Sequence, residues 1–160
     1  MASTTRFWAI ALSFALAACG GDPHGSTVRS ARVEGDALRL DLDLHFSDTL
    51  LQALDHGIPL QLEVQLAGAV ANVQYIDLRY RPLSRQYELS LPGEAGARVF
   101  GSRARLLAAL DRIVLPMTPA AAAGAVRVQL RSSALPAPLR LPALVEREWQ
   151  LATPVRPWGR

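Results

Sequence analysis

The sequence contains no lysine, and all 17 basic residues are arginine. It has a single cysteine, Cys19, which excludes an intramolecular disulfide. Aromatic residues make up only 6% of the chain, and no basic helix with interleaved aromatic residues is present, so we expect no nucleic-acid binding. The longest run of apolar or small residues, Phe7 to Ala18, has 12 residues. A membrane-spanning helix needs ~20, so this run is too short to span a bilayer.

What the chain does contain is sufficient for one folded domain. Half of its 160 residues are hydrophobic, which is enough for a sizeable core. The net charge of +3 conceals an asymmetry: residues 20–95 carry six arginines and eleven acids (net −5), and residues 96–160 carry ten arginines and three acids (net +7). Either strands from the two halves lie side by side and their opposite charges neutralise each other, or the positive half steers an acidic partner toward one side of the fold.

The first 18 residues are predicted to be an export signal. Arg6 is their only charged side chain, and the apolar run that follows it ends in Leu16-Ala17-Ala18-Cys19-Gly20. This ending resembles the bacterial lipobox. The resemblance implies cleavage between Ala18 and Cys19 and lipidation of the new N-terminal cysteine. The alternative is ordinary signal-peptidase cleavage after Ala-Leu-Ala, with Cys19 unmodified.

Several acyl chains on Cys19 would anchor the protein firmly, because each buried methylene contributes ~0.8 kcal/mol. Gly20, rather than aspartate, follows the cysteine, and by resemblance to bacterial lipoprotein sorting this favours the outer membrane. We therefore expect a periplasm-facing lipoprotein of the cell envelope. Residues 19–30 would be the lipidated cysteine and a flexible tether, and residues 31–158 a single β-rich domain.

Alternating hydrophobicity predicts most of the domain to be β-structure. On either side of the break at Arg81-Pro82-Leu83-Ser84, apolar residues recur at every second position, which is typical of a β-hairpin with one buried face. The same period of two predicts strands within residues 31–46, 60–66 and 126–130. With two short helices capped by Ser47 and Ser102, the prediction is a mainly β (α+β) fold: an antiparallel, sandwich-like domain of six or seven strands.

Three further expectations concern the second half of the chain. Leucines from Leu106, together with Ile113 and Val114, predict an apolar stripe on the second helix. The prolines at positions 136, 138 and 142 predict an extended, edge-like path. Residues 148–152 would form a last short strand with Trp149 packed inward.

The order of these features resembles the exported proteobacterial proteins of domain-of-unknown-function family 4390. The resemblance is carried by the Ser47–Gly57 helix, Gly57-Ile58-Pro59-Leu60, Leu83-Ser84-Arg85-Gln86-Tyr87, the leucine-rich helix and Leu135-Pro136-Ala137-Pro138-Leu139, and covers roughly residues 33–158. It brings no catalytic residues. Its members are often encoded beside a membrane sensor kinase, which implies at most an accessory role in envelope signalling.

Two groups of residues are candidates for a site. Asp41, Asp43 and His45 share one strand face, but alternate residues lie ~6.6 Å apart, so a cation would need bent side chains. A solvated strand face is the ordinary alternative. Arg79, Arg81 and Arg85 cluster at the hairpin turn, where arginines act either as interface anchors or as solvated surface charges.

The sequence therefore predicts a non-catalytic binding or accessory module rather than an enzyme, with no cofactor. Its predicted partners are the membrane, through the N-terminal lipid, and an envelope protein such as a sensor kinase. The alternative is a periplasmic carrier of lipid or another hydrophobic ligand. A hydrolase or a metal-binding protein is less favoured, because no nucleophile, base and orienting group can be identified together.

Overall fold

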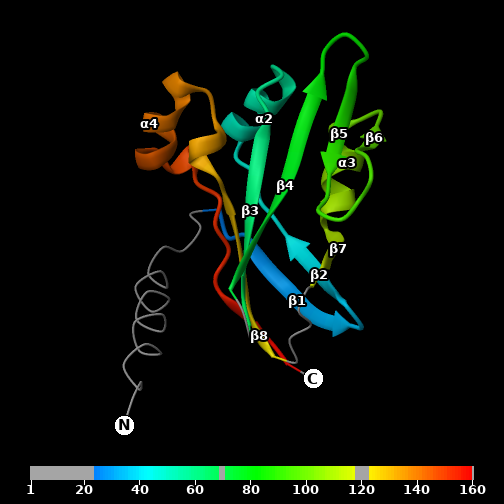
Figure 1. Ribbon diagram of the computed structural model, residues 1–160. Coiled ribbons are helices and arrows are strands. Elements are labelled where there is room, and N and C mark those ends of the chain that lie inside the picture. The colour runs from blue at the N-terminus through cyan, green and yellow to red at the C-terminus, as the bar shows by residue number, and fades with distance from the viewer. Residues whose placement is uncertain (1–23, 69–70, 118–122, 160) are drawn as a thin grey trace.

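The computed structural model describes residues 24–68, 71–117 and 123–159. Two antiparallel sheets pack face to face as a sandwich, which confirms the predicted mainly β fold class (Figure 1). The smaller sheet has the strand order β1-β2-β7, with β1 at Thr27–Glu34, β2 at Ala37–Asp43 and β7 at Arg112–Pro116. The larger has the order β6-β5-β4-β3-β8-β9, formed by β3 (Leu60–Ala67), β4 (Asn72–Arg81), β5 (Gln86–Ser90), β6 (Arg98–Phe100), β8 (Gly124–Leu130) and β9 (Arg156–Trp158).

One hydrophobic core fills the space between the sheets. Alternate residues of most strands point into it, as the period of two predicts, because successive side chains of a strand point to opposite faces; in β1 a register shift between Val28 and Ser30 interrupts the alternation. In β2, β3 and β4 the inward positions are fully or almost fully buried: Leu38, Leu40, Leu42, Leu60, Leu62, Val64, Ile76 and Leu78. Burial of a leucine side chain contributes roughly 1.5–3 kcal/mol, so this alternation holds the register of the sheets.

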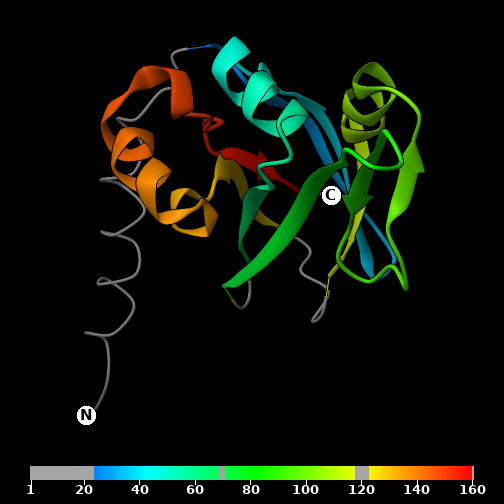
Figure 2. The same ribbon diagram turned by 90° about the horizontal axis from the view of Figure 1, so that it is seen from above.

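The helices lie at the edges of the sandwich. Helix α2 (Asp48–Asp55) begins after Ser47, whose hydroxyl accepts the Leu50 N–H at 3.2 Å, and ends before Gly57, at φ +84°. Helix α4 (Ala137–Val145) lies on one side of α2 and helix α3 (Arg103–Leu110) on the other (Figures 1 and 2). Two 3-10 turns, η2 (Ser132–Ala134) and η3 (Arg147–Trp149), flank α4.

The second predicted helix is shorter than expected. It ends at Leu110, and Ile113 and Val114 belong to strand β7 instead. The cause is tertiary pairing: β7 covers the free edge of β2, with Ile113 opposite Leu40. Ile113 is buried and Val114 points outward. The apolar residues at these two positions are therefore compatible with a helix and also with a strand of five residues.

The proline-rich segment is a helix, which corrects the predicted extended path. Pro138 lies in the first turn of α4, where backbone N–H groups have no partner within the helix, so its missing donor costs little. Pro142 lies inside the helix. The predicted last strand is also wrong: η3 occupies its first residues, Ala152 makes only an isolated bridge to Gln129, and the final strand is β9. Trp149 is buried, as expected.

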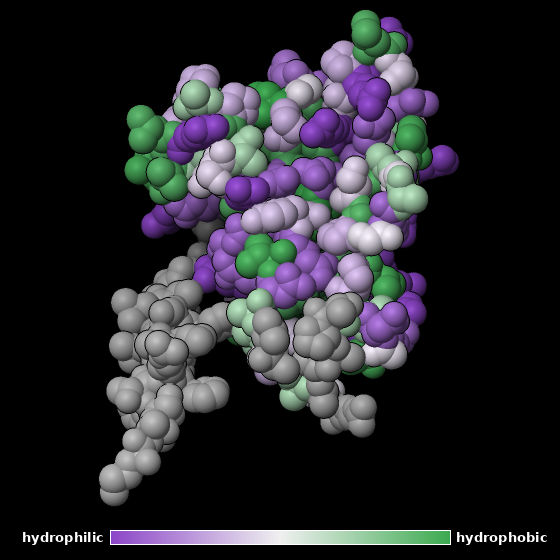
Figure 3. All heavy atoms as spheres, viewed as in Figure 1, coloured by the Kyte–Doolittle hydropathy of each residue, from purple (hydrophilic) through white to green (hydrophobic). Residues whose placement is uncertain are grey.

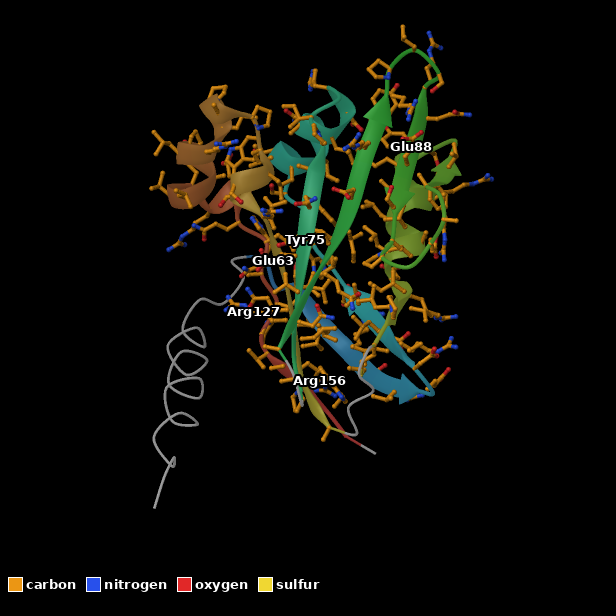
Figure 4. All side chains as sticks on the ribbon, viewed as in Figure 1. Glu63, Tyr75, Glu88, Arg127 and Arg156 are labelled. Carbon is orange, nitrogen blue, oxygen red and sulfur yellow. The ribbon has the colours of Figure 1, made fainter. Side chains whose placement is uncertain are left out.

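The outer face of the six-stranded sheet carries a network of polar side chains. Glu63 accepts hydrogen bonds from Gln65 and Gln129. The guanidinium of Arg131 lies 4.6 Å from the ring centre of Tyr75, a cation–π contact. Figure 4 shows Glu63 and Tyr75 close together at the centre of this face, and Figure 3 shows the same region as largely hydrophilic. This face is exposed to solvent, and most apolar side chains of these strands point to the other face, although Val73 of β4 stays on the outer face, 46% exposed.

Candidate partner-binding site

An open hollow of about 610 Å³ lies beside the turn between β4 and β5. Gly57 and Pro59, from the connection between α2 and β3, form one wall. The other walls come from the end of β4 and the turn itself: Arg79, Tyr80, Arg81, Pro82, Leu83 and Ser84. Segments about 25 residues apart in the sequence therefore meet here, because β3 and β4 are neighbouring antiparallel strands.

The turn projects from the sandwich as a four-residue loop. Arg81 and Gln86 are the last paired residues, leaving Pro82–Arg85 to reverse the chain. Pro82 supplies a fixed φ at the start of the loop. Arg85 has φ +52°, the only positive value among the non-glycine residues that the structure describes. Leu83 is fully exposed at the tip, with a relative accessibility of 104%. Figure 3 shows hydrophobic atoms at the top of the molecule, where Figure 1 places the hairpin of β4 and β5.

The three predicted arginines differ in their pairing. Arg81 makes a 2.6 Å ion pair through Nε with Glu88 of β5, whose side chain is only 14% exposed. Figure 4 labels Glu88 just below the turn. Arg79 and Arg85 have no ion-pair partner among the residues that the structure describes. Arg79 lines the hollow, and Arg85 directly follows Ser84, the last residue of its lining.

A compact polar cluster supports the turn from below. The rings of Tyr80 and Tyr87 lie 4.6 Å apart across the hairpin. The Tyr87 hydroxyl donates to Asp55, at the end of α2, and Arg103 of α3 forms an ion pair with the same carboxylate. Burial and, after it, the hydrogen bond to the Asp55 carboxylate together raise the pKa of Tyr87 to about 12. The base of the hairpin is thus tied to both helices.

The lining of the hollow combines cationic and apolar side chains. It offers guanidinium groups, a tyrosine ring, prolines and an exposed leucine, but no carboxylate, imidazole or thiol. Arginine recognises carboxylates through paired N–H donors, and exposed leucine and tyrosine supply apolar contact area. The hollow is therefore complementary to acidic and apolar groups.

The predicted metal candidates pair with cations of the protein itself. Asp43 lies 2.6 Å from Arg29, whose hydrogen bond and charge hold the pKa of that carboxyl below its ordinary value. His45 is 3.9 Å from Asp43. Asp41 accepts from the Ser30 hydroxyl at 2.5 Å and faces Arg112 at 3.6 Å. Within the described residues, no three His, Cys, Asp or Glu side chains form a group that could hold a metal ion.

The predicted lipidation site lies outside the described residues. Ala18 and Cys19 both precede residue 24, where the description begins. Strand β1 begins at Thr27, so the folded domain includes the last four residues of the segment predicted as a tether. No helix in the part of the chain that the structure describes is long and apolar enough to cross a membrane.

Sequence reasoning found the arginines but missed two parts of the site. It did not identify Leu83 as an apolar residue at the tip of the turn. The Pro-Leu-Ser order contained the signal, because a leucine within a turn belongs to neither strand and cannot point into the core from one. It also missed the wall of Gly57 and Pro59, because only the folded chain brings the connection after α2 against Pro82. A Cβ atom on Gly57 would lie 3.7 Å from Cγ of Pro82.

Comparison with known proteins places the whole folded domain in one family. No curated protein and no solved structure matches the chain. A family model described as a domain of unknown function (DUF4390) matches residues 27–159. The match begins at the first residue of β1 and ends one residue after β9, so it covers every strand of both sheets. The chain belongs to the DUF4390 family, which confirms the resemblance seen in the sequence.

Proposed function

We propose that this protein is a cell-envelope lipoprotein whose β-sandwich is a non-catalytic binding module, and that it binds an envelope protein through the turn between β4 and β5. The observation that carries the proposal is the arrangement at this turn. Two arginines without ion-pair partners in the described residues, Arg79 and Arg85, accompany the exposed Leu83 beside an open hollow.

The backbone of the turn supports this assignment. A non-glycine residue with a left-handed conformation costs roughly 1–2 kcal/mol, and glycine or asparagine is the usual choice at such a position. Arg85 occupies it with φ +52°. Strained backbone is concentrated at functional sites, where the side chain has a use that offsets the cost. The Arg85 guanidinium in this hairpin turn is therefore well placed to contact a binding partner.

The chemistry of the turn indicates the kind of partner. Arg79 and Arg85 each suit a carboxylate, and Leu83 suits a shallow apolar pocket or a neighbouring aromatic side chain. We therefore infer an acidic segment with at least one apolar residue. The periplasmic part of a membrane sensor kinase is the candidate that the family resemblance suggests.

The membrane anchor is the second part of the proposal. Cys19 follows a short apolar run that ends in small residues, which is the pattern required for cleavage and lipidation at this thiol. Lipidation would keep the domain at the envelope, where a low-affinity interaction benefits from a high local concentration of partner. Gly20 after the cysteine favours the outer membrane.

The test is purification of the full chain from its host envelope in mild detergent, followed by native mass spectrometry. We expect a stoichiometric protein partner with the wild-type chain and its loss after Arg79→Glu combined with Arg85→Glu. The matched control is Arg32→Glu combined with Arg156→Glu, which makes the same charge change at exposed arginines outside the hollow. The control should retain the partner.

Three results would overturn parts of this proposal. A partner that survives charge reversal at Arg79 and Arg85 removes the turn as the binding site. Bound lipid without any protein supports the carrier alternative instead. An unmodified Cys19 in the intact mass removes the lipid anchor.

A further inference from the structure

Helix α4 exposes three apolar side chains on one surface. Leu141, Leu144 and Val145 have relative accessibilities of 75%, 62% and 76%. Figure 3 shows hydrophobic groups gathered over this helix, at the upper left of the molecule. Adjacent large apolar side chains on a surface indicate a contact with another apolar medium, since a solvated helix face is ordinarily polar. We refer to Leu141, Leu144 and Val145 as the α4 patch.

The rest of the helix is firmly held, so the α4 patch has a defined position. Ala143, between the exposed residues, is buried, and so are Leu135 before the helix and Trp149 after it. The Arg140 guanidinium donates from Nε to the Leu135 carbonyl at 2.9 Å, which closes the N-terminal end of the segment. The exposed side chains are therefore presented by a packed helix and not by a loose loop.

The chain enters the fold beside this helix. The His24 imidazole makes a 3.2 Å hydrogen bond through Nε2 with the carbonyl oxygen of Arg147. Arg147 lies two residues after Val145, the last residue of α4. Cys19 precedes His24 by five residues, and a chain of five residues spans at most about 18 Å. A lipid on Cys19 would therefore bring the bilayer surface within that distance of the point where the chain meets the end of α4.

The charges near the helix indicate how it would meet the bilayer. Arg140 and Arg147 are accompanied by Glu146 and Glu148, so the segment has no excess of positive charge. Glu148 also accepts a hydrogen bond from Thr49. Attraction to anionic lipid is therefore not the main contribution, and the transfer of apolar area from water provides the driving force.

We propose that the α4 patch is a membrane-contact surface that inserts its apolar side chains into the interface of the same bilayer that holds the Cys19 lipid. This inference rests on the lipid anchor in the proposed function. Proximity to the anchor favours the bilayer over a second copy of the chain or another protein, because a short tether confines α4 to the bilayer surface.

Contact at two points would also fix the orientation of the domain. A lipid anchor alone allows the sandwich to rotate about its tether, whereas a second contact through α4 does not. In Figures 1 and 2, α4 lies at one side of the molecule and the hairpin of β4 and β5 at the other. The partner-binding turn would then lie on the side of the domain opposite the α4 patch, clear of the contacted bilayer.

The test uses the full lipidated chain, reconstituted in vesicles of phosphatidylethanolamine and phosphatidylglycerol. The Leu144→Cys variant carries the one free thiol once Cys19 is acylated, since the sequence has no other cysteine. An environment-sensitive fluorophore at this position should lose roughly half or more of its emission to a lipid with a spin label near the headgroup, because interfacial helices insert ~5–10 Å. The control is Leu83→Cys, an exposed leucine at the hairpin tip, which should show no quenching.

A second variant separates insertion from simple proximity. Leu141→Ser combined with Val145→Ser should abolish quenching at position 144 while leaving the thermal unfolding temperature unchanged, because both side chains are already exposed. An unquenched label at position 144 on a chain with a triacylated mass overturns the membrane contact and leaves the anchor intact. A label whose emission is blue-shifted but not quenched also overturns the membrane contact, because it shows that another protein covers the α4 patch. An unmodified Cys19 overturns the anchor itself, and this inference with it.

Discussion

The hydroxyl of Tyr87 donates a 2.8 Å hydrogen bond to Oδ1 of Asp55, joining strand β5 to the last residue of helix α2. A carboxylate at the C-terminus of a helix is unfavourable, because the helix dipole is negative there. Arg103 of α3 and the Tyr87 hydroxyl both bind Asp55 and compensate for this position. One carboxylate thus connects the hairpin that bears the candidate site to two helices.

Loss of this hydrogen bond should destabilise the fold modestly. Tyr87→Phe removes the hydroxyl but keeps the ring that packs against Tyr80. We expect a decrease of about 1 kcal/mol in the free energy of unfolding, since Asp55 keeps its pairing with Arg103. Urea denaturation measures it, with an unchanged m-value. The control is Tyr80→Phe, because the Tyr80 hydroxyl makes no hydrogen bond with the described residues, and a loss as large in that variant would contradict the assignment.

Alkaline pH should weaken the fold through the same residue. The pKa of Tyr87 is raised to about 12 from an ordinary value of 10.0, so between these values the folded state keeps a proton that the unfolded state has lost. Stability then decreases as pH rises, because the unfolded state binds fewer protons. The contribution of Tyr87 is complete below pH 10.0 and is lost as pH approaches 12. Urea midpoints across this range should fall less steeply for Tyr87→Phe, and parallel curves would refute the prediction.

The left-handed backbone at Arg85 predicts opposite effects on stability and binding. Arg85→Gly removes the side chain that disfavours φ +52°, and we expect a gain of about 0.5–1 kcal/mol in stability. The same variant should lose affinity for the envelope partner, because it removes one of the two hairpin arginines that have no ion-pair partner within the described part of the chain. Thermal unfolding measures the first effect and co-purification the second. Arg81→Gly is the control: it removes the Glu88 ion pair at a strand position and should be destabilising.

Close packing at Gly124 should make that glycine indispensable. A Cβ atom there would overlap the Ala67 carbonyl oxygen and the Trp158 indole, where β8 meets both β3 and β9. Gly124→Ala should therefore cost roughly 1–3 kcal/mol by overpacking. Gly96→Ala is the control, because a Cβ at Gly96 would meet no atom within 4 Å. A chemical-denaturation difference close to zero between the two variants would show that the strands can shift apart at little cost.

The candidate site was only partly predictable from the sequence. Its arginines could be placed because they sit at a break between two alternating segments, and such a break is local information. The wall formed by Gly57 and Pro59 could not, because it depends on how the connection after α2 packs against Pro82. The pairing of Arg81 with Glu88 was also invisible until the hairpin register aligned β4 with β5.

The sequence by itself determined the strands whose apolar residues alternate, the Ser47 cap and the central hairpin, since these depend on the two-residue period and on local hydrogen bonds. Tertiary structure decided the rest. Residues 112–116 became a strand because β2 had an unpaired edge to fill, and residues 137–145 became a helix because packing of Ala143 holds a segment whose prolines predict otherwise. Local preferences are worth only fractions of a kcal/mol per residue, so edge pairing and burial override them wherever the chain meets a distant neighbour.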